Sequence, residues 1–317
     1  MPRRAGIFAT VLILAACQPP APAVAPGPIP AAIQTDVSFI GSERQEGRAV
    51  GSAGSNRVAS YIVQLYKQLA LPGAFPAQCS PAQPPCDASY FQPFSRQNAR
   101  NAKNIGVVIN GSDAAVRNQY IVIGAHYDHI GRSQTLSLDE ERADSIRPGA
   151  DDNASGTAAI MELARRLAAR PPRRSIMIVH FDAEEVGLYG SEFFVDAPPV
   201  PRRQMKFMLN LDMVGRLSAG KFSADTTSLI FPDVRVISVL DSASRSLGIR
   251  IAYINDINGR SDHASFRRVD VPSIALFTGF HSDYHRATDV VSKLDVRGIG
   301  RIADIAEALV RFEADRR

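Results

Sequence analysis

The sequence has little excess charge, no tryptophan, three cysteines in 317 residues and only one long apolar run. A formal net charge of +4, without a basic stripe that alternates with aromatic residues, is not typical of a nucleic-acid-binding protein. No second hydrophobic segment suggests a transmembrane helix, and no internal repeat is evident. These absences argue against nucleic-acid binding, a polytopic membrane protein and a repeat architecture.

The one long apolar run, Ala5–Ala16, follows two arginines and ends in LAAC at Leu14–Cys17. Its twelve residues are too few to cross about 30 Å of hydrocarbon as a helix, so a secretory signal explains it better. The pattern resembles a bacterial lipoprotein signal, which implies cleavage before Cys17 and acylation of its thiol. Gln18 follows that cysteine, and a residue other than Asp favours the outer membrane of a Gram-negative bacterium. We expect a signal peptide at 1–16; an ordinary cleaved signal with a released product is the alternative.

The rest of the chain divides into a tether and one domain. Residues 17–32 are the predicted lipidated cysteine followed by an uncharged stretch rich in Pro and Ala, which predicts an extended tether. Residues 33–317 are enough for one large catalytic domain with a single core. The remaining cysteines, Cys79 and Cys86, lie in a Pro-rich segment without periodicity. In a secreted protein such a pair predicts a surface loop closed by a disulfide.

Strands and helices alternate in the predicted domain. Ser155–Arg170 predicts a helix with Ser155 as its N-cap and Pro171–Pro172 as its stop, and 54–69 predicts an earlier amphipathic helix. The last helix has an apolar face formed by Ile302, Ile305, Leu309 and Phe312. Buried strands are predicted at Ala102–Ile109, Gln119–Ala125, Arg174–Phe181, Lys206–Leu211 and Val271–Phe277. This alternation predicts a three-layer α/β sandwich.

Five side chains of the kinds that bind metals lie in five separate motifs. Two imidazoles and three carboxylates suit zinc or a similar divalent ion, because thiolate-rich sites select softer metals and all-oxygen sites select calcium or magnesium. Five ligands are enough for two ions if one carboxylate bridges them, and such two-metal sites occur in hydrolases, including aminopeptidases. The five are His126 in AHYDH, Asp152 in GADDNASG, Glu185 in DAEE, Asp212 in NLDM and His285 in DYH.

The spacing of these motifs supports a common site. Successive intervals from His126 through Asp152 and Glu185 to Asp212 are 26, 33 and 27 residues, close to the roughly 30 residues of a strand–helix–strand unit. Ligands therefore recur about once per unit. In an open α/β sheet this places them at the carboxyl ends of the strands, where such folds bind their ligands.

These motifs resemble those of the di-zinc aminopeptidases of the aminopeptidase Y and bacterial leucyl aminopeptidase type. Glutamate carboxypeptidase and glutaminyl cyclase are clan relatives of that family. The resemblance implies a mixed central β-sheet flanked by helices, as in zinc exopeptidases. It also covers segments outside the five motifs: GR at Gly47–Arg48, YFQPF at Tyr90–Phe94, KNIGVVING at Lys103–Gly111, SDHASF at Ser261–Phe266 and FTGFHSDYHRATD at Phe277–Asp289.

The resemblance implies a role for each ligand. His126 and Asp212 would hold one zinc ion, Glu185 and His285 would hold the second, and Asp152 would bridge both. A water or hydroxide shared by the two ions would be the nucleophile, and no covalent acyl-enzyme would be needed.

Two further carboxylates receive roles beside the metals. Glu184 would be the general base that takes the water proton and passes it to the leaving amine. Asp128 lies two residues after His126, on the same side of an extended segment, so it can orient that imidazole. The residues alone do not decide which member of Asp151/Asp152 or of Glu184/Glu185 binds metal; the family pattern favours the second of each. Divergent environments must separate the two members of a pair.

Four other histidines have less direct expectations. His180 lies inside an apolar strand, which predicts a hydrogen-bonded core residue. His129 and His281 are expected in loops around the cleft. For His263, pocket lining and structural support are equally expected.

These observations predict a metal-dependent aminopeptidase that acts on peptides with a free amino end. A carboxypeptidase-type hydrolase stays open, because Arg132, Arg216, Arg260 and Arg286 lie near the motifs and could bind a free carboxylate. A glutaminyl cyclase is the other alternative, although animal-type cyclases carry tryptophans around the metal. A binding module with a dead site would have lost ligands, and none is missing here.

Overall fold

The computed structural model describes residues 31–76, 87–139, 144–217, 221–225, 234–254 and 261–317. The predicted signal peptide, the predicted acylation site Cys17, most of the predicted tether, and the Cys79–Cys86 pair lie outside the described residues. Within these residues, no helix is both long and apolar enough to cross a membrane. The first helix begins at Ala31, so the last two residues of the predicted tether are helical.

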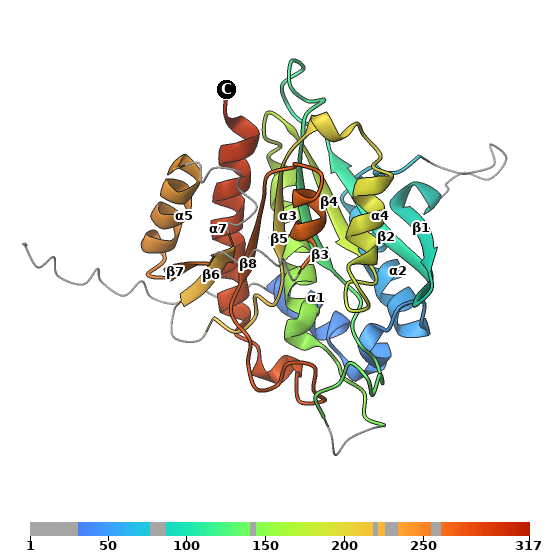
Figure 1. The fold of residues 1–317 in the computed structure, drawn as a ribbon. Coiled ribbons are helices and arrows are strands. Elements are labelled where there is room, and N and C mark those ends of the chain that lie inside the picture. Colours follow the sequence, from blue (N-terminus) through green and yellow to red (C-terminus); the bar gives the residue numbers. More distant parts are fainter. Residues whose placement is uncertain (1–30, 77–86, 140–143, 218–220, 226–233, 255–260) are drawn as a thin grey trace, which may run out of the picture.

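A mixed sheet of eight strands forms the centre of the described structure, in the order β1-β2-β4-β3-β5-β8-β6-β7 (Figure 1). β3 runs parallel to its neighbours β4 and β5, and β5 runs parallel to β8; antiparallel pairs join β1 to β2, β2 to β4 and β6 to β8. The predicted mixed central sheet is therefore confirmed. The bounds are β1 Phe91–Arg96, β2 Ala99–Ile109, β3 Tyr120–His126, β4 Ser175–Phe181, β5 Met205–Leu211, β6 Lys221–Asp225, β7 Arg250–Ile254 and β8 Ser273–Phe277.

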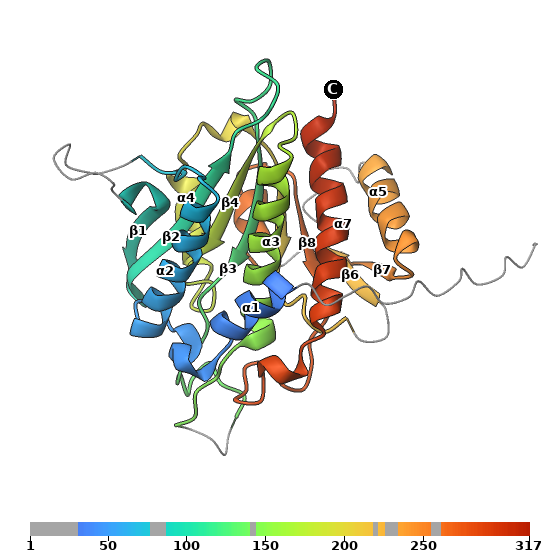
Figure 2. The same cartoon turned by 180° about the vertical axis from the view of Figure 1, so that it is seen from behind.

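Helices cover both faces of the sheet and make the predicted three layers. Alternate residues of each central strand enter opposite cores: in β3, Ile121 and Ile123 pack in the larger core and Val122 in the smaller one. Helices α1, α2, α3 and α7 lie on the face seen in Figure 2, and α4 lies on the opposite face. The bounds are α1 Ala31–Ile40, α2 Ala53–Gln68, α3 Gly156–Ala169, α4 Tyr189–Asp196, α5 Val234–Ser246, α6 His263–Arg267 and α7 Val296–Asp315.

The start of α3 differs from the prediction. Ser155 precedes the helix, but its backbone is already helical and its hydroxyl donates to the Asp151 carbonyl at 2.7 Å instead of capping α3. The cap is Asn153, whose Oδ1 accepts a hydrogen bond from the amide of Gly156 at 2.9 Å. Ser155 therefore occupies the predicted N-cap position but its side chain does not cap the helix, and α3 ends at Ala169, one residue before the predicted end at Arg170.

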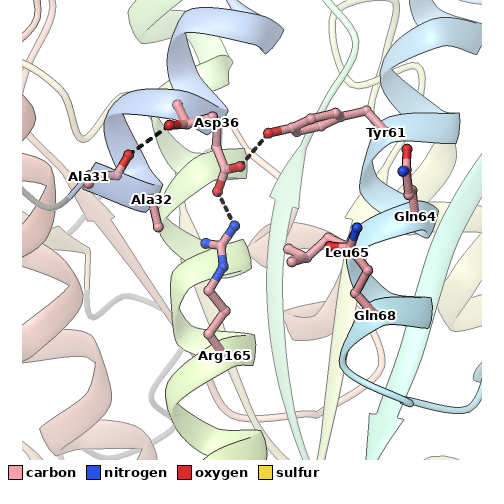
Figure 3. Close-up of a pocket in the computed structure, with 9 residues that line it drawn as sticks. Ala31, Ala32, Asp36, Tyr61, Gln64, Leu65, Gln68 and Arg165 are labelled. Carbon is pink, nitrogen blue, oxygen red and sulfur yellow. Dashed lines mark hydrogen bonds and ion pairs between the residues drawn. The ribbon is translucent and has the colours of Figure 1, made fainter.

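A buried carboxylate joins α1 to two neighbouring helices. Asp36 is 1% exposed and accepts hydrogen bonds from the Tyr61 hydroxyl of α2 at 2.6 Å and from Arg165 Nη2 of α3 at 2.7 Å (Figure 3). These three side chains line a cleft of about 350 Å³ on the helical face. None of the five predicted ligands lines this cleft. We therefore assign the hydrogen bonds of Asp36 a role in packing α1 against the domain.

Candidate metal centre

The five predicted ligands converge at one edge of the sheet. His126 is the last residue of β3, Asp212 directly follows β5, and Glu185 lies in the loop that follows β4. These three strands are neighbours and run parallel, so their carboxyl ends meet at the predicted edge. Asp152 reaches the edge from the segment before α3, and His285 from the segment after β8.

One half of the cluster is formed by His126, Asp152 and Asp212. His126 Nε2 lies 3.3 Å from Asp152 Oδ1 and 3.4 Å from Asp212 Oδ1. Two ligand atoms that share a tetrahedral zinc ion at 2.0–2.2 Å are themselves roughly 3.3–3.6 Å apart. The imidazole nitrogen is therefore spaced from each carboxylate oxygen as a co-ligand of one ion would be, and the three residues offer ligand atoms within 4.8 Å of one another.

The other half is formed by His285, Glu185 and the same Asp152. His285 Nε2 lies 3.3 Å from Asp152 Oδ2 and 3.0 Å from Glu185 Oε2. Asp152 thus directs Oδ1 to one half and Oδ2 to the other, which is the geometry that a bridging carboxylate requires. Asp212 Oδ1 and His285 Nε2 are buried and make no hydrogen bond of acceptable geometry within the described residues. A metal ion bound between these side chains would give both atoms a partner.

The electrostatic potential of the cluster is strongly negative. Burial alone would lower the pKa of His126, but Glu184, Asp128, Asp152 and Asp212 outweigh it and hold that pKa well above its usual range. Burial likewise lowers the pKa of His285, and Asp152 with Glu185 outweighs it and raises the pKa to about 10. Such a potential attracts divalent cations, and an ion that binds here displaces the imidazole protons.

The two acidic pairs have the divergent environments expected of them. Burial raises the pKa of Glu184, and the neighbouring carboxylates of Glu185 and Asp212 raise it further. Burial also acts on Glu185, but hydrogen bonds and charge from His129 and His285 outweigh it and lower that pKa. In the same way, burial raises the pKa of Asp151, whereas His126 and His285 hold that of Asp152 well below its usual range.

Asp128 links the His126 strand to the loop of paired glutamates. Its carboxylate accepts hydrogen bonds from the backbone amides of Glu184 at 3.1 Å and Glu185 at 3.3 Å. Asp128 Oδ1 lies 3.6 Å from His126 Nδ1, an ion-pair distance, and the nearer group to that nitrogen is the Asp128 carbonyl at 3.3 Å. The Asp128 side chain therefore orients the loop that carries Glu184 and Glu185 at least as directly as it orients the His126 imidazole.

The sequence did not reveal the part played by Arg48. Its guanidinium is fully buried, and burial lowers its pKa to about 10. The side chain donates five hydrogen bonds, all to backbone carbonyls, and so fastens the amino-terminal segment to the loops that carry His126 and Asp152. The acceptors are the carbonyls of Ile40, Tyr127, Pro148, Gly149 and Asp152. The Gly47–Arg48 motif was the only sequence signal for this role.

Asp289 holds the segment that contains the bridging carboxylate. Its Oδ2 accepts hydrogen bonds from the backbone amides of Asp151 at 2.9 Å and Asp152 at 3.1 Å, and its Oδ1 accepts one from Arg216 Nη2 at 3.1 Å. His281 Nε2 lies 3.1 Å from Asp151 Oδ2. Asp289 and His281 both come from the segment of His285, so this segment both supplies a candidate ligand and supports another.

The remaining histidines divide between core and site. His180 is a buried core residue whose Nε2 lies 2.5 Å from the Tyr66 hydroxyl, as the apolar strand predicted. Burial lowers its pKa to about 3. His263 is 3% exposed and lines the cleft at the cluster. His129 lies in a loop, as expected, but it is buried with Nδ1 2.6 Å from Glu185 Oε1 and does not line the described cleft.

A cleft of about 280 Å³ opens at the cluster. Its acidic end contains Asp152, Glu184 and Asp212, and the described lining includes no arginine. Arg216 is instead paired with Asp289 and Asp283, and Arg286 lies 3.7 Å from Asp139. The other lining residues are mostly apolar or aromatic: Met213, Ile254, Ala275, Phe277, Phe280 and Tyr284, together with His126, Ser261 and His263.

Comparison with known proteins places this geometry in context. The model of peptidase family M28 matches residues 104–310. The leupeptin-inactivating enzyme 1 of Streptomyces exfoliatus is 27% identical over 302 residues, 91% of this chain and 58% of that protein. An aminopeptidase of Pseudomonas aeruginosa is 31% identical over 168 residues, 51% of this chain and 29% of that protein. The chain thus spans less than two thirds of the length of these curated relatives.

A solved structure shares the fold over nearly the whole chain. The Zn-dependent exopeptidase from Parabacteroides distasonis has a TM-score of 0.71 and 20% sequence identity, over 92% of this chain and 100% of that one. At 20% identity this likeness shows the fold alone, which is an α/β fold with flanking helices.

Proposed function

Because the chain belongs to peptidase family M28, we propose that it is a zinc-dependent aminopeptidase, which removes amino-terminal residues from peptides. The observation that carries the proposal is the division of the cluster into two halves that share Asp152. In each half, the imidazole nitrogen lies 3.0–3.4 Å from one oxygen of each of two carboxylates, close to the spacing of zinc co-ligands. The donor set contains no thiolate, which suits a catalytic rather than a purely structural zinc site.

We propose two zinc ions per chain. His126 and Asp212 would hold one, Glu185 and His285 would hold the other, and Asp152 would be shared by both. When bound, such a pair of ions lowers the pKa of a water molecule toward neutrality and polarises the scissile carbonyl.

Glu184 has the position and the environment of the general base. It lines the cleft, and its carboxylate is close enough to His126 and Glu185 to belong to the same cluster. It is not needed to complete either half, so its carboxylate is free to accept the proton of the attacking water and deliver it to the leaving amine. The backbone amide of Glu184 donates a hydrogen bond to the Asp128 carboxylate, which holds this part of the backbone in place.

The chemistry of the cleft favours recognition of a free amino end. Its acidic end can receive a substrate ammonium beside Glu184 and Asp212, an interaction that is stronger in a partly dry cleft than in water. A carboxypeptidase usually binds the free carboxylate with an arginine, and the described lining contains no arginine; Arg260 lies outside the described residues. The apolar walls formed by residues such as Met213 and Phe277 suit a large apolar first side chain.

Acetylating the amino end of a good substrate, such as a leucyl peptide, should abolish cleavage, because the acetyl amide carries no charge for the acidic end of the cleft. Amidating the carboxyl end of the same peptide should change the rate little. Mass spectrometry of the products of the free, acetylated and amidated peptides measures both effects. Cleavage of the acetylated peptide with sparing of the amidated one would assign a carboxypeptidase, and loss of ammonia from glutaminyl peptides would assign a cyclase.

We also propose an outer-membrane lipoprotein with its catalytic domain in the periplasm or at the cell surface. The proposal rests on the LAAC pattern that ends at Cys17 and on the Pro-rich and Ala-rich residues that follow it. Acylation of the Cys17 thiol would anchor the enzyme, and its substrates would be peptides of the cell envelope.

Replacing Cys17 with serine should abolish labelling by a fatty-acid analogue and leave the precursor uncleaved, since the thiol is the site of acylation. Labelling followed by gel electrophoresis of cell fractions measures both effects. Cys79→Ser, outside the signal, is the matched control and should be labelled like the wild type. Equal labelling of Cys17→Ser and wild type would rule out this anchor.

A further inference from the structure

His129 contacts three of the five candidate ligands, although it is not one of them. Its Nδ1 lies 2.6 Å from Glu185 Oε1 and 3.8 Å from Asp152 Oδ2, and its ring meets the His285 ring edge to face at a centroid distance of 5.6 Å. It is 1% exposed. All three contacts are on the Glu185–His285 half of the cluster, and none is with His126 or Asp212.

We infer that His129 is a positioning residue that fixes Glu185 as a ligand and so sets the affinity of one of the two metal ions. The inference rests on the proposed metal centre. A carboxylate only accepts hydrogen bonds, so the contact requires that Nδ1 carry the proton and donate it to Oε1. This bond occupies Oε1 and turns the second oxygen, Oε2, toward His285 Nε2 at 3.0 Å. Glu185 then presents a single oxygen to the metal in a fixed direction.

The surroundings of His129 hold the ring in this orientation. Its other nitrogen, Nε2, is buried and makes no hydrogen bond within the described residues, so a proton there would lack an acceptor. Gly149 packs against the ring, and a Cβ at that position would lie 2.4 Å from His129 Cγ. The backbone amide of His129 donates to the carbonyl of Arg48 at 3.3 Å. The imidazole is therefore placed to donate to Glu185, and within the described residues its ring makes no other hydrogen bond.

The test compares two substitutions of His129 by zinc binding. In His129→Asn the amide nitrogen takes the place of Nδ1 and can still donate to Glu185, whereas His129→Leu fills similar space without a donor. Metal-free protein is titrated with Zn²⁺ in competition with a chromophoric chelator. We expect wild type to bind two ions, His129→Leu to lose about 10- to 100-fold in affinity for one ion only, and His129→Asn to stay near wild type.

Thermal unfolding of the metal-free variants separates positioning from packing. A positioning role predicts that the two variants unfold at similar temperatures without zinc and differ only in zinc affinity. Wild-type affinity for both ions in His129→Leu would overturn the inference and leave the two-zinc proposal intact. Equal loss in His129→Asn and His129→Leu would also overturn it, since the donor would then not matter. Absence of zinc binding by wild type would overturn the proposed function and the inference together.

Discussion

Replacing Asp152 with alanine should remove both metal ions, whereas replacing His126 with alanine should weaken only one. Asp152 directs Oδ1 toward His126 at 3.3 Å and Oδ2 toward His285 at 3.3 Å, so one side chain serves both halves of the cluster. His126 Nε2 faces only the half that contains Asp212. Metal analysis of the dialysed proteins should give close to zero ions per chain for Asp152→Ala and about one for His126→Ala, and kcat should fall most in the former.

The neighbouring carboxylate supplies a matched control. Asp151 is as deeply buried as Asp152, but its oxygens accept from the Gly215 amide at 2.6 Å and meet His281 Nε2 at 3.1 Å, away from both halves of the cluster. Asp151→Asn keeps an oxygen for the Gly215 amide and should keep both ions. If Asp152→Ala and His126→Ala each lost the same single ion, Asp152 would not bridge.

The place where the site forms was predictable from the sequence, because it depends on features that short segments encode. Apolar runs of strand length end at His126 and just before Asp212, and the ends of neighbouring parallel strands meet at one edge whatever the details of packing. The spacing of about 30 residues between motifs indicated the parallel connections. The lining of the cleft by Phe280 and Tyr284 could not be read in the same way, since it depends on how the segment after β8 folds over the edge.

The supports of the site were not predictable, because they act through backbone groups far away in the sequence. Arg48 donates to the carbonyls of Gly149 and Asp152, about a hundred residues away. Asp289 accepts from the amides of Asp151 and Asp152, again from a distant segment. A carbonyl or an amide is the same at every residue, so no side-chain pattern marks the acceptor. The one signal for these contacts is that Arg48 and Asp289 are charged and buried. Burial depends on the fold, so it cannot be read from the sequence.

Short elements at the edges of the fold were also missed, for a related reason. β6 at Lys221–Asp225 and β7 at Arg250–Ile254 are five residues each, too short for periodicity to identify. Ser155 was chosen as a cap because serine is a common N-cap, but in the fold its hydroxyl is drawn to the Asp151 carbonyl and the Val214 amide. The preference of serine for capping a helix was overridden here by hydrogen bonds of its hydroxyl to the loops around the candidate metal site.

Glu184 and Glu185 are adjacent in the sequence, but their surroundings shift their pKa values in opposite directions. Glu185 is surrounded by the two imidazoles of His129 and His285, which lower its pKa and suit a permanently ionised ligand. Burial raises the pKa of Glu184 instead, and the acidic side chains of Glu185 and Asp212 add to that effect. A carboxylate that binds a proton readily is the kind that can take one from water and pass it on. The structure therefore supports separate roles for two adjacent glutamates.

Replacing Glu184 with glutamine should lower kcat by about 10²- to 10⁴-fold while both metal ions are retained. The amide has the shape of the carboxylate but cannot accept a proton, so the barrier should rise by roughly 3–5 kcal/mol. Because its raised pKa makes Glu184 take up a proton at higher pH than an exposed glutamate, wild-type kcat should fall as the pH is lowered, and the variant should lack this fall. Glu185→Gln is the contrasting variant: it should lose affinity for one ion. Steady-state kinetics across pH, with metal analysis of each sample, separates the two, and full activity of Glu184→Gln would remove this residue from the mechanism.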